Sequence, residues 1–210
     1  TVKAIVTAAG NDGGAASQSS PGSCDGAVNV AGILISGAKA SASNFGAGVT
    51  VAAPYGSSAS DGVGSSGAIL SLGNDGTTSF IASPGGDIVL EVGGTSFSAP
   101  LVSGVVSLML SVNPNLSASQ VYDTLRQSAR AFPSSSNCRN VGCGAGTVDA
   151  AAAISMARDN PPAVRSFPDS TDNDSGGGGG CSVARGASDG SLPLLLLFAC
   201  GYAWRRLGAR

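Results

Sequence analysis

The sequence predicts an α/β fold with a mainly parallel sheet. Residues 2–8 and 27–35 are almost continuously apolar, which is the pattern of strands buried on both faces, as in a parallel sheet. Further strands are expected at 49–53 and 88–92, and segments with helical signals follow them. Strands interleaved with helices are typical of α/β proteins, and a hydrophobic content of 42% supports a real core.

Three helices are expected in the second half of this domain. The first runs from about Ser96 to Val112. The second runs over about 117–129, because Ser117 followed by Gln120 three residues later forms a capping box. An Ala-rich third helix follows Val148.

Length, charge and composition indicate how the chain is divided and which partners are not expected. The chain has 210 residues and a net charge of -2, which gives no reason to expect nucleic acid as a partner. We expect the domain to cover residues 1–158, a Pro/Asp/Gly-rich disordered linker to cover 159–180, and a separate tail to cover 181–210. Thr1 lies inside the first apolar run, so we also expect sequence upstream of it.

The strongest chemical signal is the segment from Gly94 to Pro100, Gly-Thr-Ser-Phe-Ser-Ala-Pro, directly before an apolar helix. A serine hydroxyl is a weak nucleophile unless it is positioned and deprotonated. At a helix N-terminus, free N–H groups point at any oxyanion that forms beside Ser96. The alternative interpretation is that Ser96 only caps the helix.

A second signal is the segment from Ala8 to Gly13 at the end of the first strand. Loops at the carboxyl ends of parallel strands are where α/β proteins place their sites. Asn11 could donate its side-chain amide to an oxyanion. The alternative is that Asn11-Asp12-Gly13 forms an ordinary turn.

Together these segments resemble the subtilisin-like serine proteases, peptidase family S8. That family carries its nucleophile in a Gly-Thr-Ser-x-x-x-Pro motif and its oxyanion asparagine in an Ala-Ala-Gly-Asn segment. The order and spacing of several further segments agree with the family from Thr1 to about Ile154. They include residues 41–46 (Ser-Ala-Ser-Asn-Phe-Gly), 51–54 (Val-Ala-Ala-Pro) and 143–151, which ends in Thr-Val-Asp-Ala-Ala. The resemblance implies a partial three-layer subtilisin-like fold whose N-terminal strands are missing.

The resemblance also assigns roles to individual residues. Ser96 is implied as the nucleophile, and Asn11 as the oxyanion donor together with the backbone N–H of Ser96. Ala8, Ala9 and Gly10 are implied to line the pocket for the residue before the scissile bond. Asp12 would lie near the floor of that pocket and favour basic side chains, with a solvated loop acid as the alternative.

The chain also departs from the family pattern. Leu101 replaces the usual histidine after the motif's proline, Tyr55 replaces a glycine, and residues 55–84 form a long Gly/Ser-rich segment. The chain has no histidine at all. Since the family's aspartate and histidine motifs precede its Ala-Ala-Gly-Asn strand, we expect them upstream of Thr1. The fragment as given is therefore expected to be inactive.

Cys138 and Cys143 flank a short loop rich in turn residues, so a disulfide between them is expected, in an oxidising compartment. With no histidine and no second close cysteine pair, we expect no metal at these cysteines. Cys24 is either a buried thiol or paired with a cysteine upstream of Thr1, and we expect no partner for it within residues 1–158. No cofactor is identifiable, although family members often bind structural calcium.

The tail resembles bacterial tripartite C-terminal sorting signals. Glycines 176–180 and Cys181 precede an apolar run that includes 192–197, and Arg205 and Arg206 follow it. This layout implies export to the surface of a Gram-negative bacterium and a processing or sorting enzyme as a partner. The alternative is a plain membrane anchor.

Two functions compete. The first is an exported serine endopeptidase that acts on proteins or peptides by acyl transfer. The second is a catalytically dead surface module that binds peptides. Ser96 and Asn11 together favour the endopeptidase, because a binding module needs neither residue.

Overall fold

A three-stranded parallel sheet forms the centre of the structure, a computed structural model that describes residues 2–166. Its strands are β1 (Val6–Ala8), β2 (Val28–Ile33) and β3 (Val51–Pro54), in the order β1-β2-β3. Every residue of β2 is buried. The parallel pairing is confirmed, and so is burial on both faces for β2, whereas β1 covers only the end of the run expected at 2–8 and is only partly buried.

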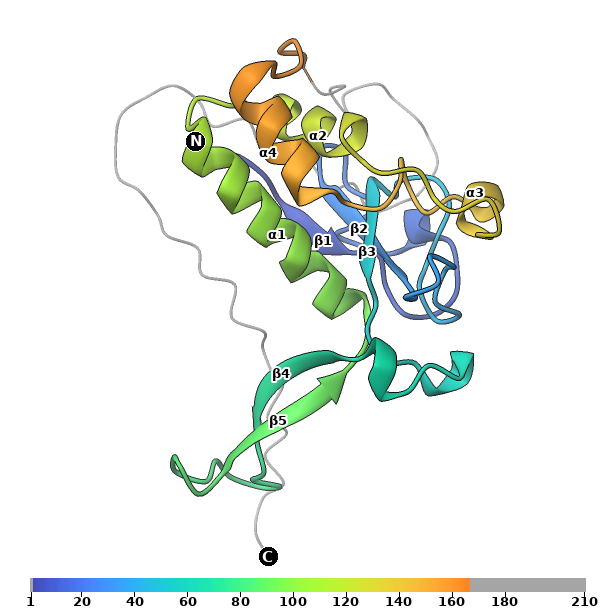
Figure 1. The fold of residues 1–210 in the computed structure, drawn as a ribbon, viewed down its shortest axis with the longest axis vertical. Helices are drawn as coiled ribbons and strands as arrows, with labels where there is room; N and C mark the ends of the chain where they lie inside the picture. The colour runs from blue at the N-terminus through green and yellow to red at the C-terminus, as the bar shows by residue number, and fades with distance from the viewer. Residues whose placement is uncertain (1, 167–210) are drawn as a thin grey trace, which may run out of the picture.

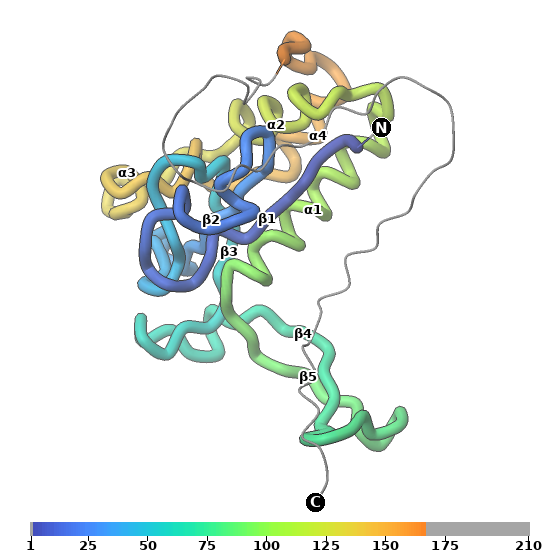
Figure 2. Tube along the Cα trace, turned by 180° about the vertical axis from the view of Figure 1, so that it is seen from behind, coloured from blue at the N-terminus to red at the C-terminus, as the bar shows by residue number. Residues whose placement is uncertain are grey.

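Three helices cover one face of this sheet. They are α1 (Thr95–Val112), α2 (Ala118–Gln127) and α4 (Ala150–Asp159). Helix α1 lies along the sheet, contacts all three strands and packs against α4 (Figures 1 and 2). The shared core consists mainly of aliphatic side chains from β2, β3 and these helices, among them Val28, Val30, Val51, Val102, Met109 and Leu125, and Leu116 joins it from the loop between α1 and α2.

Helix α2 begins as its sequence predicts. The Ser117 hydroxyl accepts from the Gln120 N–H, and the Gln120 side chain accepts from the Ser117 N–H, so the capping box is complete. The helix ends at Gln127, two residues earlier than expected. The Ala-rich helix after Val148 is α4, capped by the Asp149 carboxylate.

The other face of the sheet is covered by irregular segments, the 3-10 helix η1 (Ala16–Gln18) and the four-residue helix α3 (Cys138–Val141). Cys138 and Cys143 form the predicted disulfide, and both are buried in the small core on this side. Cys24 is disulfide-bonded as well, so the interpretation as a buried thiol was wrong. Its partner is neither Cys138 nor Cys143, because these two are bonded to each other.

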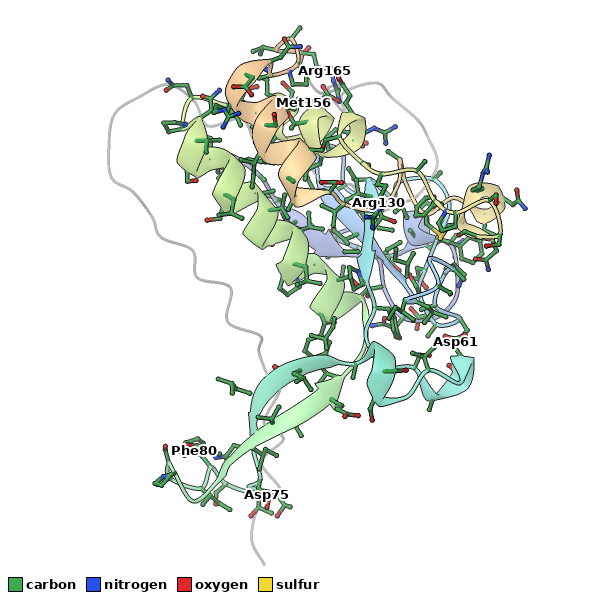
Figure 3. All side chains as sticks on the ribbon, in the orientation of Figure 1. Asp61, Asp75, Phe80, Arg130, Met156 and Arg165 are labelled. Atoms are coloured by element: carbon green, nitrogen blue, oxygen red, sulfur yellow. A yellow bond between two sulfur atoms is a disulfide. The ribbon has the colours of Figure 1, made fainter. Side chains whose placement is uncertain are left out.

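An antiparallel hairpin projects from the body beyond the start of α1 (Figures 1 and 3). It consists of β4 (Ile69–Asn74) and β5 (Asp87–Val92), preceded by the short helices η2 (Ala59–Asp61) and η3 (Ser65–Gly67). The strand expected at 88–92 is present as β5, outside the parallel sheet. Its partner β4 was not predicted.

The chain after α4 lies against α2. Gln120 Nε2 donates to the Pro162 carbonyl at 2.9 Å, and Arg165 pairs with Asp123 at 2.5 Å (Figure 3). The expected disordered linker was placed from residue 159, but Asp159 ends α4, and the segment that follows it is held by these bonds. The rest of the linker and the tail lie outside the described residues.

Candidate active site

Ser96 lies in the first turn of α1, next to the end of the hairpin. Gly94 is the N-cap residue, and no side chain caps this helix. Its φ of 140° lies in a region that favours glycine, which lets the chain turn from β5 into the helix. Ser96 is exposed, and its side chain has no hydrogen-bond partner within residues 2–166. The structure therefore does not use Ser96 as a helix cap.

Asn11 follows β1 and is joined directly to the start of α1. Its side-chain oxygen Oδ1 accepts from the Thr95 backbone N–H at 3.0 Å and from the Thr95 hydroxyl at 3.1 Å. These bonds bring together two segments 84 residues apart in the chain. The amide Nδ2 of Asn11 has no hydrogen-bond partner within residues 2–166, so it is available as a donor there. Asn11 is therefore more than a turn residue.

Thr95 makes the connection between the two segments. It is completely buried, and its Oγ1 also accepts from the Gly10 N–H at 3.3 Å. Thr95 belongs to the Gly-Thr-Ser motif, but no role for it was predicted from the sequence. The position of Thr95 directly before the proposed nucleophile was the one feature of the sequence that could have indicated a role in the site.

The other predicted pocket residues lie on or beside the same loop. Ala9 is fully buried in the core on the irregular face, so it can offer only backbone to a ligand. Ala8 is half-buried against the α1 side of the sheet. Asp12 is exposed, and its backbone N–H is bound by the Asn44 side chain at 3.0 Å.

Asn44 was not singled out as a functional residue. It is 2% exposed, and its Oδ1 accepts from the N–H groups of both Asp12 and Gly14. The segment 41–46 contributed only to the family resemblance. A single buried asparagine in such a run gives no signal for a long-range contact.

A charged cluster stabilises the segment that carries Asn44. Lys39 Nζ donates to the carbonyls of Ala40, Ser41 and Ser43 at 2.8–2.9 Å. Burial lowers the pKa of Lys39, and the Asp61 charge opposes this effect. Asp61 accepts from the Ser41 N–H at 2.8 Å, which ties η2 to the same segment.

Two open hollows, of roughly 490 and 370 Å³, lie beside α3 and the loop before β3. Neither is lined by Ser96 or Asn11. Residues 2–166 also contain no group of three or more His, Cys, Asp or Glu side chains placed to bind a metal.

These features define an α/β protein with its candidate site at the carboxyl edge of a parallel sheet. Residues 2–167 match the subtilase family, peptidase S8. The chain therefore belongs to the subtilase family, and the resemblance found in its motifs is confirmed.

Similar proteins agree with this assignment. The chain is 44% identical over 154 residues to an extracellular protease of Xanthomonas campestris pv. campestris. It is 36% identical over 155 residues to an extracellular basic protease of Dichelobacter nodosus. These matches cover 73% and 71% of this chain, but the chain spans only 23% of the length of each relative.

A solved structure confirms the fold. The structure described as proteases from Pseudoalteromonas arctica superposes with a TM-score of 0.64 at 34% identity, and the match covers 73% of this chain and 42% of that one. The expected subtilisin-like α/β fold is therefore present.

Proposed function

We propose that this chain carries the nucleophile and the oxyanion donor of an exported serine endopeptidase. Ser96 Oγ attacks the carbonyl carbon of a peptide bond, and a general base takes its proton. The base then protonates the leaving amine, and water hydrolyses the acyl-enzyme by the same steps in reverse order. Asn11 Nδ2 and the Ser96 N–H donate to the oxyanion of each tetrahedral intermediate.

The pair of hydrogen bonds from Thr95 to Asn11 is the observation that carries this proposal. It fixes the amide carbonyl of Asn11 with two hydrogen bonds, from the residue immediately before Ser96. The donor therefore cannot turn away from the nucleophile without losing both bonds. Such preorganised donors are often the largest single contribution to acyl-transfer catalysis.

The general base must come from outside this sequence, because the 210 residues include no histidine. The family resemblance implies a histidine that takes the Ser96 proton and an aspartate that orients it. Both would be supplied by the longer protein, as the greater length of the relatives allows. This division of the triad explains an intact nucleophile in a chain without a base.

Proteins or peptides are the proposed substrates. Asp12 is exposed beside Asn11 and would favour a basic side chain before the scissile bond. Ala8 and Gly10 would contribute walls on either side of the buried Ala9. Structural calcium, which family members often bind, stays an expectation from the resemblance.

The tail supports a proposal about location. The zone from Cys181 onward would act as a sorting signal, with Arg205 and Arg206 retained on the cytoplasmic side until processing. The apolar run from 192 to 204 is about 13 residues, short of the roughly 20 that span a bilayer as a straight helix. Identifying the C-terminus of the mature protein tests this: a retained Trp204 with unmodified Cys181 contradicts the sorting signal.

The peptidase assignment is tested in the complete protein that carries this chain. Ser96→Ala should reduce kcat for a peptide substrate by at least about 10,000-fold, because covalent catalysis is lost. Ser103→Ala is the matched control, an exposed serine on the same helix whose hydroxyl bonds the Ala99 carbonyl. Equal activity of Ser96→Ala and Ser103→Ala would contradict the assignment and favour a binding module.

A further inference from the structure

The loop that carries Asn11 is held from outside by the segment 42–45. Four backbone hydrogen bonds of 2.7–3.0 Å join the two segments. The N–H groups of Gly13 and Ala16 donate to the carbonyls of Ala42 and Phe45. In the other direction, the N–H groups of Asn44 and Phe45 donate to the carbonyls of Gly10 and Gly14. The segment is therefore bonded along the loop that carries Asn11.

Asn44 adds side-chain contacts to these backbone bonds. Its Oδ1 accepts from the N–H groups of Asp12 at 3.0 Å and Gly14 at 2.9 Å, and its Nδ2 donates to Ser19 Oγ at 2.9 Å. Its own N–H donates to the Gly10 carbonyl. Asn44 is only 2% exposed, so its side chain is shielded from solvent.

We propose that Asn44 is the positioning residue that sets the direction of the oxyanion donor Asn11. Its bonds fall at residues 10, 12 and 14, so they fix the backbone on both sides of Asn11. Thr95 fixes the side-chain oxygen of Asn11 and the N–H of Gly10, which lies on one side of Asn11 only. Asn44 touches no reacting atom and acts through Asn11, so the inference rests on the proposed function.

The packing at Gly10 shows how closely Asn44 approaches the loop. Gly10 has a φ of +106°, and a Cβ added there would collide with Asn44 Nδ2. The amide therefore lies in contact with the loop backbone itself. A shift of Asn44 would move the residue directly before Asn11.

The first test compares kinetic constants in the complete protein. Asn44→Ala leaves the N–H groups of Asp12 and Gly14 unpaired, and a donor displaced by about 1 Å lowers kcat up to about 100-fold with little change in KM. Asn44→Asp keeps the two acceptor positions and should restore kcat to within about tenfold of wild type. Asn29→Ala, which removes another buried asparagine, is the control and should leave kcat unchanged.

A double-mutant cycle tests whether Asn44 acts through Asn11. In an Asn11→Ala background the oxyanion donor is already lost, so Asn44→Ala should lower kcat by less than about twofold. An equal loss in both backgrounds, or no loss in the wild-type background, overturns the inference. If the unmodified protein hydrolyses no peptide, the proposed function fails instead.

Amide hydrogen exchange supplies a readout that needs no activity. The N–H groups of Asp12 and Gly14 should exchange at least about tenfold faster in Asn44→Ala, because without the Asn44 acceptor they can exchange without a local opening that breaks a hydrogen bond. Asn29→Ala should leave their exchange unchanged. Unaltered protection in Asn44→Ala means that Asn44 does not hold the loop, and it overturns the inference whatever the activity.

Discussion

Thr95 and Asn11 show how single side chains join distant parts of the sequence into one site. Thr95 uses its N–H and its hydroxyl on one acceptor, Asn11 Oδ1. The Ser96 N–H, one residue further along, has no partner within residues 2–166. Two donors, Asn11 Nδ2 and the Ser96 N–H, therefore remain free for an oxyanion.

Loss of the Asn11 amide is predicted to affect turnover rather than binding. In the complete protein, Asn11→Ala should lower kcat by about 100- to 1,000-fold, the magnitude known for the oxyanion asparagine of subtilisin itself. KM should change little, because the donor acts mainly in the transition state. Steady-state kinetics on a peptide substrate measures both constants. A large rise in KM with unchanged kcat would show that Asn11 binds substrate instead.

Asn29 contrasts with Asn44, although both asparagines are buried. Asn29 lies in β2 at 0% exposure, and neither polar atom of its side chain has a partner among the described residues. Its cross-strand neighbour Thr7 also has an unpartnered hydroxyl. A buried polar group without a partner destabilises the fold by about 1–3 kcal/mol.

We therefore predict that Asn29→Leu, which has a similar shape, is neutral or stabilises the protein by up to about 2 kcal/mol. Asn44→Leu is the matched comparison and should destabilise by at least about 2 kcal/mol, because it removes the acceptor of the Asp12 and Gly14 N–H groups. Urea unfolding of the complete protein gives both values. If Asn29→Leu loses as much stability as Asn44→Leu, the proposed difference between the unpartnered Asn29 and the hydrogen-bonded Asn44 is refuted.

At the scale of elements, the helices and strands that depend on neighbouring residues in the sequence could be predicted. The capping box placed the start of α2, and the continuous apolar run placed β2. Strand β4 was missed because Gly and Ser interrupt its short sequence, and its pairing with β5 follows 12 residues of intervening chain. Helix α3 has only four residues, too few for a periodic pattern.

The candidate site was predictable only where its residues lie in contiguous motifs. Ser96 and Asn11 each stand in a recognisable segment, so sequence analysis could propose them. The roles of Thr95 and Asn44 depend on contacts across 84 and about 30 residues of sequence. No periodicity or spacing encodes such contacts, and they become visible only in the folded chain.

Asp61 attaches η2, which precedes the hairpin, to Ser41 in the body (Figure 3). Burial raises the pKa of its carboxyl, but hydrogen bonds from Ser58 and Ser41 and the charge of Lys39 outweigh burial and hold the pKa below its usual value. A lowered pKa stabilises the fold fully above the unfolded value of about 4, and this stabilisation is lost as the pH falls through the folded pKa.

Asp61→Asn should therefore reduce stability at pH 7, and its difference from wild type should narrow below about pH 4. Urea midpoints between pH 2.5 and 7 measure this difference. Asp75→Asn, which removes an exposed carboxylate on the hairpin loop (Figure 3), should stay close to wild type over the same range. A difference in urea midpoint between Asp61→Asn and wild type that stays constant with pH contradicts the role given to the Asp61 carboxylate.

At the scale of the whole molecule, the chain contains the proposed nucleophile and the two proposed oxyanion donors, but no histidine. It also spans only 23% of the length of the relatives from Xanthomonas and Dichelobacter. Without a base, the Ser96 hydroxyl stays protonated at neutral pH. The 210 residues alone should then hydrolyse no peptide bonds.

Covalent labelling with a fluorophosphonate tests the central claim most directly. An activated serine displaces fluoride and forms an Oγ–phosphorus bond, and mass spectrometry of the digested protein locates the adduct. We predict an adduct on Ser96 in the complete protein, and none in its Ser96→Ala variant or in the 210-residue chain alone. An adduct on another serine of the complete protein, or efficient labelling of the isolated chain, would contradict the account.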